Sequence, residues 1–224
     1  MIWFLGIPLA LIAAAFLYWQ LKYPTYSYRY KLTVEIDTPE GVRSGYAVRE
    51  VTWRDGPRIT MEAPAGTMKE RGEAVAVDLP NGQTLFALLY SKNQGVTARL
   101  AFGTSRLKPP YDRGAVDVII PKRKNPVWGQ NGYPRLVTFR DLEDPQSVER
   151  LDPSSLSELL GEGYELRRVT AELTDEAITK NVEKMLLASG WEAGRPLDLT
   201  RGGSSNLTLA QQLSYRDFSR GVIE

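Results

Sequence analysis

The chain opens with a long run of apolar residues. Residues 1–21 contain no charged side chain, and residues 2–19 read IWFLGIPLALIAAAFLYW. As an α-helix, this segment would rise about 27 Å, close to the length that crosses the hydrocarbon core of a bilayer. Trp3 near one end and Trp19 near the other suit the aromatic belts of the two membrane interfaces. The pattern predicts one transmembrane anchor, residues 1–21, which contacts the lipid bilayer through residues 2–19.

A cleaved signal peptide is the alternative, because Ala13 and Ala15 could form a small-residue cleavage site. No Lys or Arg precedes the apolar run, however, whereas signal peptides have a basic start. We therefore expect a retained anchor. The basic residues Lys22, Arg29 and Lys31 follow it, which favours a cytoplasmic domain under the positive-inside rule. Three charges are a weak bias, and the side of the membrane stays open.

Apolar and polar residues alternate from Tyr26 to Asp37, beyond a short juxtamembrane linker at residues 22–25. The even positions are apolar and begin with three tyrosines, so the pattern predicts a strand with one buried face. Pro39 and Gly41 then predict a turn, since proline presets one backbone angle and glycine accepts the left-handed one.

A second strand is predicted at residues 42–54, and its pattern slips. The apolar positions are even as far as Val48 and odd from Val51 onward. A shift of one residue reverses the faces of a strand, so we expect a β-bulge near Arg49 and Glu50.

Further elements follow from turn and cap signals. Pro80-Asn81-Gly82 predicts a hairpin, and the doubly apolar residues 85–90 predict that its second strand is central. Helices are expected after Asp152-Pro153 and after the cap residue Thr174, and within residues 207–218. The predicted strands of this region cover residues 74–79, 83–90, 115–120, 136–140 and 164–173.

These elements predict an α+β fold: a mainly antiparallel β-sheet domain with two or three short helices toward the C-terminus, preceded by one transmembrane helix. The length of 224 residues fits one soluble domain, residues 26–224, behind the anchor.

Composition excludes several chemistries. The chain has no cysteine and no histidine, so it forms no disulfide, no thiolate zinc site and no Ser-His-Asp triad. The 28 basic and 27 acidic residues nearly balance, which argues against a nucleic-acid partner.

The short motifs do not predict a catalytic, cofactor-binding or metal-binding residue. The acidic stretch at residues 141–152 lacks the spacing of a calcium loop and is typical of turns and caps. Ser105 and Lys108 match S-x-x-K, but the prolines that follow disfavour the helix this motif needs. Gly161-Glu162-Gly163 lacks the third glycine of a dinucleotide fingerprint. The basic run Lys122–Lys124 is interpreted as a solvated loop, with contact to lipid head groups or an acidic partner as the alternative.

Two motifs carry a resemblance. TPEGVRSG at residues 38–45 and FRDLEDPQSV at residues 139–148 resemble segments of a group of uncharacterised proteobacterial membrane-associated proteins. The resemblance fades toward the C-terminus, where Met185-Leu186-Leu187 stands in place of a Leu-Pro-Trp segment. It implies a bacterial, membrane-associated protein with one β-rich domain, and no known function comes with it. With the single predicted anchor, we expect a single-pass protein of the bacterial inner membrane.

The leading hypothesis is a membrane-anchored, non-enzymatic protein that serves as a protein-interaction or envelope accessory module, with a protein partner of unknown identity. Two alternatives stay open: a membrane-tethered hydrolase that uses carboxylates or Ser and Lys, and an accessory subunit of a larger membrane complex whose anchor packs through Gly6 or Ala13–Ala15.

Overall fold

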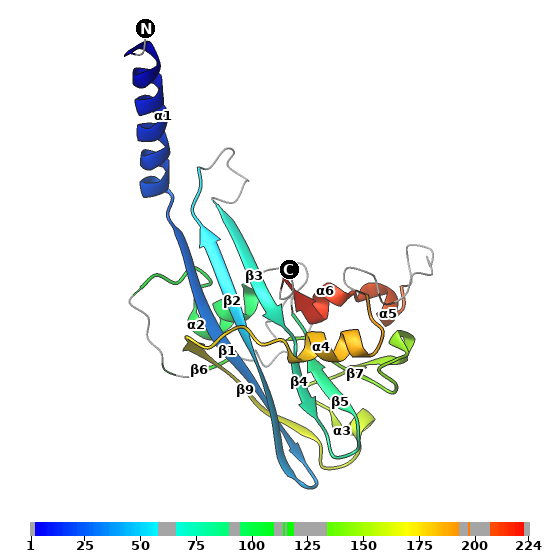
Figure 1. Ribbon diagram of the computed structural model, residues 1–224. Coiled ribbons are helices and arrows are strands. Elements are labelled where there is room, and N and C mark those ends of the chain that lie inside the picture. The colour runs from blue at the N-terminus through cyan, green and yellow to red at the C-terminus, as the bar shows by residue number, and fades with distance from the viewer. Residues whose placement is uncertain are drawn as a thin grey trace.

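A helix of 20 residues, α1 (Trp3–Lys22), projects away from the body of the protein in the computed structural model (Figure 1). The structure describes residues 3–57, 66–89, 95–109, 114, 116–118, 134–192, 197 and 207–221, and the side chains of these except at 3–10, 116 and 117. Only Tyr23 and Pro24 separate the helix from the first strand, and Tyr23 N still donates to Trp19 O.

Two antiparallel sheets form the body. The larger sheet has the strand order β10-β3-β2-β1-β9-β6, and the smaller has the order β4-β5-β7-β8. The strands of the larger sheet are β1 (Thr25–Thr38), β2 (Gly41–Arg54), β3 (Thr67–Glu73), β6 (Val116–Asp117), β9 (Glu165–Thr174) and β10 (Ser219–Arg220). Those of the smaller sheet are β4 (Val75–Asp78), β5 (Thr84–Ala87), β7 (Leu136–Phe139) and β8 (Val148–Leu151).

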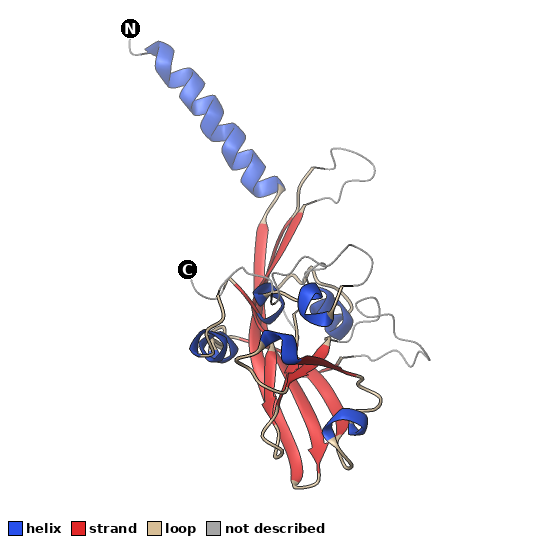
Figure 2. Cartoon of the chain, turned by 90° about the vertical axis from the view of Figure 1, so that its right-hand side faces the viewer, coloured by secondary structure: helices blue, strands red, loops and turns tan. Residues whose placement is uncertain are grey.

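Short helices complete the described part of the chain, and Figure 2 views the molecule from the side on which several of them cover the strands. They are α2 (Val96–Phe102), the 3-10 turn η1 (Pro145–Ser147), α3 (Ser157–Leu160), α4 (Asn181–Ala188), α5 (Leu209–Gln212) and α6 (Tyr215–Phe218).

Three layers enclose two apolar clusters. The main core lies between the sheets and contains the inward residues of β1, such as Leu32 and Val34, together with Leu85 of β5. The second cluster lies between the smaller sheet and α4–α6, where Phe86 and Phe139 pack against Phe218. The smaller sheet is thus buried on both faces, which explains why β5 is apolar at consecutive positions. The mainly antiparallel α+β fold is confirmed.

The predicted β-bulge in the second strand is wrong. Pairing of β1 with β2 runs without a shift from Thr25↔Arg54 to Thr38↔Gly41. All odd positions of β2 from Ala47 onward are buried, and Arg49 is among them, fully buried in an otherwise apolar row. The even residues Val42 and Tyr46 lie exposed on the opposite face. The apparent slip is therefore an inward arginine, not an extra residue.

The hairpin at Pro80-Asn81-Gly82 is confirmed, with β4 and β5 paired on either side and β5 in the interior of its sheet. The helix predicted directly after Thr174 is wrong in its start. Thr174 Oγ1 accepts from Glu176 N and closes a turn, and α4 begins at Asn181. The helix expected directly after Asp152-Pro153 begins only at Ser157, as α3, because Asp152 accepts from Ser154 N in a turn. The helix expected within residues 207–218 is divided into α5 and α6.

The predicted anchor coincides with α1, whose side chains from Leu11 onward are exposed. Among the residues that the structure describes, no helix meets the length and apolarity needed to cross a membrane. The transmembrane character of α1 therefore stays a prediction.

Candidate functional site

A pocket of about 390 Å³ opens where β9 ends beside β1. Thr174, the last residue of β9, pairs with Arg29, whereas β1 begins four residues earlier at Thr25. The chain is no longer part of the sheet from Asp175 onward, and the pocket lies between this segment and β1. Its lining consists of Ser27, Tyr28, Arg29, Glu50, Leu173, Thr174 and Asp175.

Arg29 fixes the geometry of this pocket. Its Nε donates to Glu50 Oε2 at 3.1 Å across the β1–β2 pair, and its Nη1 donates to the carbonyls of Asp175 and Glu176. The same segment is held by Lys31, whose Nζ lies 2.9 Å from Glu176 Oε1; this hydrogen bond raises the pKa of Lys31. Part-exposed ion pairs of this kind stabilise by at most about 1 kcal/mol each, so their main effect is positional.

The lining residues carry hydroxyl groups, the guanidinium of Arg29, which is paired with Glu50, and the carboxylates of Glu50 and Asp175. None of these lining residues is a histidine or a cysteine. The polar groups of the pocket are suited to accept a polar side chain or a small polar ligand.

A second polar group is buried at the junction of the two sheets. Tyr30, Arg49, Glu70 and Glu73 are all at most 2% exposed. Arg49 Nε donates to the carbonyl of Glu73 at 3.0 Å, and its Nη2 to the carbonyl of Ala87 at 3.4 Å, which joins β2 to β3 and to β5. Each of these side chains is therefore shielded from solvent by the described part of the chain.

The carboxylate of Glu73 serves as the cap of α4. Its two oxygens accept from the backbone N–H groups of Asn181 and Glu183, at 2.9 and 3.1 Å. These are N–H groups of the first helical turn, which have no partner within the helix, and a negative charge there also favours the helix dipole.

Two buried tyrosines share this environment. Burial, followed by the neighbouring Glu70 carboxylate, raises the pKa of Tyr30 well above 10. Tyr215 donates to Glu183 Oε1 at 3.1 Å, and burial with that carboxylate raises the pKa of Tyr215 to about 12. Both hydroxyls are therefore held as donors.

The acidic stretch forms turns, as its pattern predicts. Asp141, Asp144 and Asp152 accept from the backbone N–H groups of Glu143, Gln146 and Ser154, and the hydrogen bonds from Ser154 lower the pKa of Asp152. In the described ranges, no cluster of acidic residues is arranged to hold a metal ion.

The structure places Ser105 and Lys108 of the S-x-x-K match in an irregular segment, residues 104–109, and not on a helix. Lys108 Nζ lies 5.5 and 5.6 Å from the ring centroids of Tyr26 and Trp53. Gly161 and Gly163 both have positive φ in the loop after α3. The basic run Lys122–Lys124 lies outside the described residues.

Sequence reasoning missed both the pocket and the buried polar group. The pocket depends on where β9 leaves β1, which no local pattern records. The buried group did leave one signal, because Arg49 occupies an inward position between Ala47 and Val51.

An aromatic and basic collar surrounds the end of α1. Lys22 Nζ donates to the Tyr18 hydroxyl at 3.1 Å, which raises the pKa of Lys22, and it lies 5.7 Å from the centre of the Tyr23 ring. The Trp19 and Tyr23 rings are 4.7 Å apart. Aromatic and basic side chains of this kind are enriched at the membrane–water interfaces of membrane proteins.

No family model, no curated protein and no solved structure matches this chain.

Proposed function

We propose that the protein is a single-pass membrane protein of the bacterial inner membrane, in which α1 holds a non-enzymatic interaction module beside the bilayer. The observation that carries the proposal is the apolar surface of α1. Six large side chains between residues 11 and 21 are 61–74% exposed: Leu11, Ile12, Phe16, Leu17, Tyr18 and Leu21.

These residues surround the helix axis instead of forming one stripe, because successive residues turn by about 100°. A helix that is apolar on all sides is stable only inside a large core or in lipid. Nothing in the described body covers it (Figure 1). The absence of charge through residue 21 and the collar at Tyr18–Tyr23 support the same location.

An interaction role is supported by how the polar groups of the body are used. The buried carboxylates act as hydrogen-bond acceptors within the fold, whereas the open pocket beside Arg29 presents polar groups to solvent. A partner that inserts a polar side chain would meet the pocket close to the membrane end of β1.

Membrane attachment is tested with the full-length protein in cells. After alkaline carbonate extraction, the proposal expects the protein in the membrane pellet with the peptide of residues 1–21 still present by mass spectrometry. A soluble mature protein that lacks this peptide would establish the cleaved signal peptide instead.

The interaction role is tested by capture from detergent-solubilised membranes with matched variants. Ser27→Trp fills the pocket and is expected to lose the partner, while Ser44→Trp on the distal part of the hairpin keeps it. Equal recovery of the partner with both variants would exclude the pocket as the contact. A partner lost only on replacement of α1 by an unrelated anchor would favour the accessory-subunit alternative.

A further inference from the structure

The end of the body nearest α1 is basic. We call it the membrane-proximal end and define it as residues 22–28, 52–57, 66–69 and 104–109. These segments meet because Thr25, Arg54 and Thr67 stand side by side in the pairing of β1, β2 and β3. They carry five basic residues, Lys22, Arg54, Lys69, Arg106 and Lys108, against one acidic residue, Asp55.

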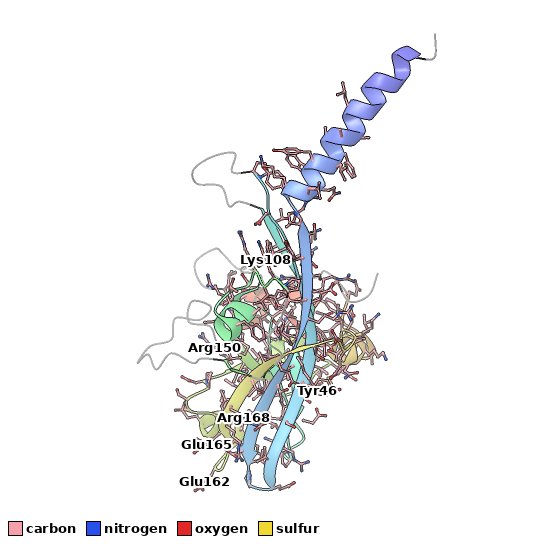
Figure 3. All side chains as sticks on the ribbon, turned by 90° about the vertical axis from the view of Figure 1, so that its left-hand side faces the viewer. Tyr46, Lys108, Arg150, Glu162, Glu165 and Arg168 are labelled. Atoms are coloured by element: carbon pink, nitrogen blue, oxygen red, sulfur yellow. The ribbon has the colours of Figure 1, made fainter. Side chains whose placement is uncertain are left out.

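The opposite end is acidic. We call it the distal end and define it as residues 36–44 and 161–167, which meet where Gly163 lies against the Pro39 ring. It carries four acidic residues, Asp37, Glu40, Glu162 and Glu165, against Arg43 and Arg167. In Figure 3, Lys108 lies near the exit of α1, and Glu162 and Glu165 lie toward the far end, with Arg168 near them. The described segments at the two ends of the body therefore carry opposite net charges.

Side-chain contacts hold the basic end together and join it to the exit of α1. The Tyr26 and Trp53 rings stack at 4.7 Å, with the Lys108 ammonium over both. Trp53 Nε1 donates to the Leu107 carbonyl at 3.0 Å, which fastens residues 104–109 to the hairpin. Arg54 Nε donates to the Tyr23 carbonyl at 3.3 Å, directly at the exit of the helix.

We propose that the membrane-proximal end binds the anionic phospholipid head groups of the bilayer that holds α1. The proposal rests on the proposed membrane attachment and adds to it a second, electrostatic contact that sets the orientation of the body.

The distances allow this contact. Tyr26 follows Lys22 by four residues, so an extended chain places the Lys108 region no more than about 13 Å beyond the helix end. The head-group layer is about 6 Å thick, and a surface potential acts over a further 8 Å or so at physiological ionic strength. Anionic lipids attract the basic end and repel the acidic one, so both ends favour the same orientation.

The test uses the full-length protein in nanodiscs, and the absence of native cysteine allows single-site labelling. A fluorophore is attached through Pro109→Cys at the basic end or Glu162→Cys at the distal end. The discs contain either phosphatidylcholine alone or phosphatidylcholine with about one third phosphatidylglycerol. Both kinds carry the same fraction of a lipid with a nitroxide on its head group, which quenches nearby fluorophores.

The expected result is stronger quenching at position 109 in the anionic discs, with weak quenching at position 162 in both. The difference should disappear at about 0.5 M salt, where screening shortens the range of the surface potential. The triple variant Lys22→Gln/Lys69→Gln/Lys108→Gln should lower the ratio of docked to free orientations on the order of a hundred-fold and remove the lipid dependence. The control Lys180→Gln/Lys184→Gln/Arg216→Gln removes three exposed charges elsewhere and should retain it.

Two results would overturn the inference separately from the proposed function. Equal quenching at position 109 in the two kinds of disc, or a lipid dependence unchanged in the triple variant, rejects head-group binding while α1 remains in the disc. A full-length protein that does not co-elute with the discs rejects both proposals.

Discussion

The Tyr30 hydroxyl donates to Glu70 Oε1 at 2.5 Å inside the main core, where neither side chain is more than 2% exposed. The second oxygen of Glu70 accepts from the backbone N–H of Gly95, immediately before α2. One buried carboxylate thus joins β1, β3 and the start of a helix that follows the smaller sheet's first hairpin.

Tyr30→Phe removes one donor to this carboxylate and leaves the ring in place. Because an unsatisfied buried acceptor costs about 1–3 kcal/mol, we expect that loss in the free energy of unfolding. Urea unfolding of the full-length protein in detergent measures it. Tyr46→Phe, at a position that is 48% exposed, is the control and should change the stability by less than about 0.5 kcal/mol. Equal stability of the two variants would contradict a structural role for the Tyr30 hydroxyl.

Alkaline pH should lower the free energy of unfolding, because the buried hydroxyls of Tyr30 and Tyr215 have raised pKa values. An unfolded tyrosine has a pKa near 10, whereas that of Tyr30 is raised well above this value and that of Tyr215 to about 12. The folded state then holds protons that the unfolded state releases, so the stabilisation is complete below about pH 10 and is lost as the pH rises through 12.

Unfolding midpoints of the full-length protein, followed by tryptophan fluorescence across this interval, measure the decline. Tyr215→Phe should make it shallower, because one of the two raised groups is gone. A midpoint that is independent of pH between about 9 and 12 would show that these hydroxyls titrate as they do in the unfolded chain.

Glu73→Gln tests the cap of α4. A glutamine keeps one acceptor oxygen and turns an NH₂ group toward the other backbone N–H, so either Asn181 N or Glu183 N loses its partner. The expected cost is about 1–2 kcal/mol of unfolding free energy, with faster hydrogen exchange at the amides of α4. Glu176→Gln removes an equal charge from an exposed ion pair and should leave that exchange unchanged.

Local patterns predicted the strands of this fold better than its helices. The alternation from Tyr26 to Asp37 and the Pro80-Asn81-Gly82 turn suffice for two hairpins, since a buried face and a turn together specify an antiparallel pair. The Thr174 cap signal failed because its hydroxyl closes a turn that carries the chain across the sheet, and α4 takes its cap from Glu73, about a hundred residues earlier in the chain.

The candidate site was beyond prediction for a similar reason. The pocket beside Arg29 is made by β1, β2 and the end of β9, whose register is known only once the sheet is assembled. The inward arginine was visible in the sequence, but a polar residue in an apolar row has two explanations, a shift of register or a buried partner. The unshifted pairing of β1 with β2 excludes the first, and the carbonyls of Glu73 and Ala87 supply the buried partners.

Gly45→Ala tests the contact between the two sheets. A β carbon at Gly45 would overlap the carbonyl oxygen of Ala76 in β4, so the two backbones must separate to accept it. Overpacking of this kind costs about 1–3 kcal/mol, and we expect a lowered unfolding midpoint with a near-unchanged denaturant slope. Ser44→Ala, next to it on the exposed face, is the control. A wild-type midpoint for Gly45→Ala would mean that the sheets have room to move apart.

Substitutions of Arg49 distinguish the effect of its two hydrogen bonds between the sheets from the effect of its positive charge. Arg49→Met removes the side-chain donors to both buried carbonyls, which should cost about 2–4 kcal/mol. Arg49→Lys keeps the charge but has no planar guanidinium group to reach both carbonyls, so we expect an intermediate loss of unfolding free energy.

Arg43→Met is the control. Arg43 is exposed near the turn of the hairpin, so this substitution removes a positive charge without removing a hydrogen bond to either carbonyl. If Arg49→Met were as stable as the wild-type protein, apolar packing would have replaced the bridge at no net cost, as happens for some buried charges. If instead Arg49→Met were the least stable and Arg49→Lys were intermediate between it and the wild-type protein, the hydrogen bonds to the two carbonyls, and not the charge alone, would account for an arginine in the apolar row of β2.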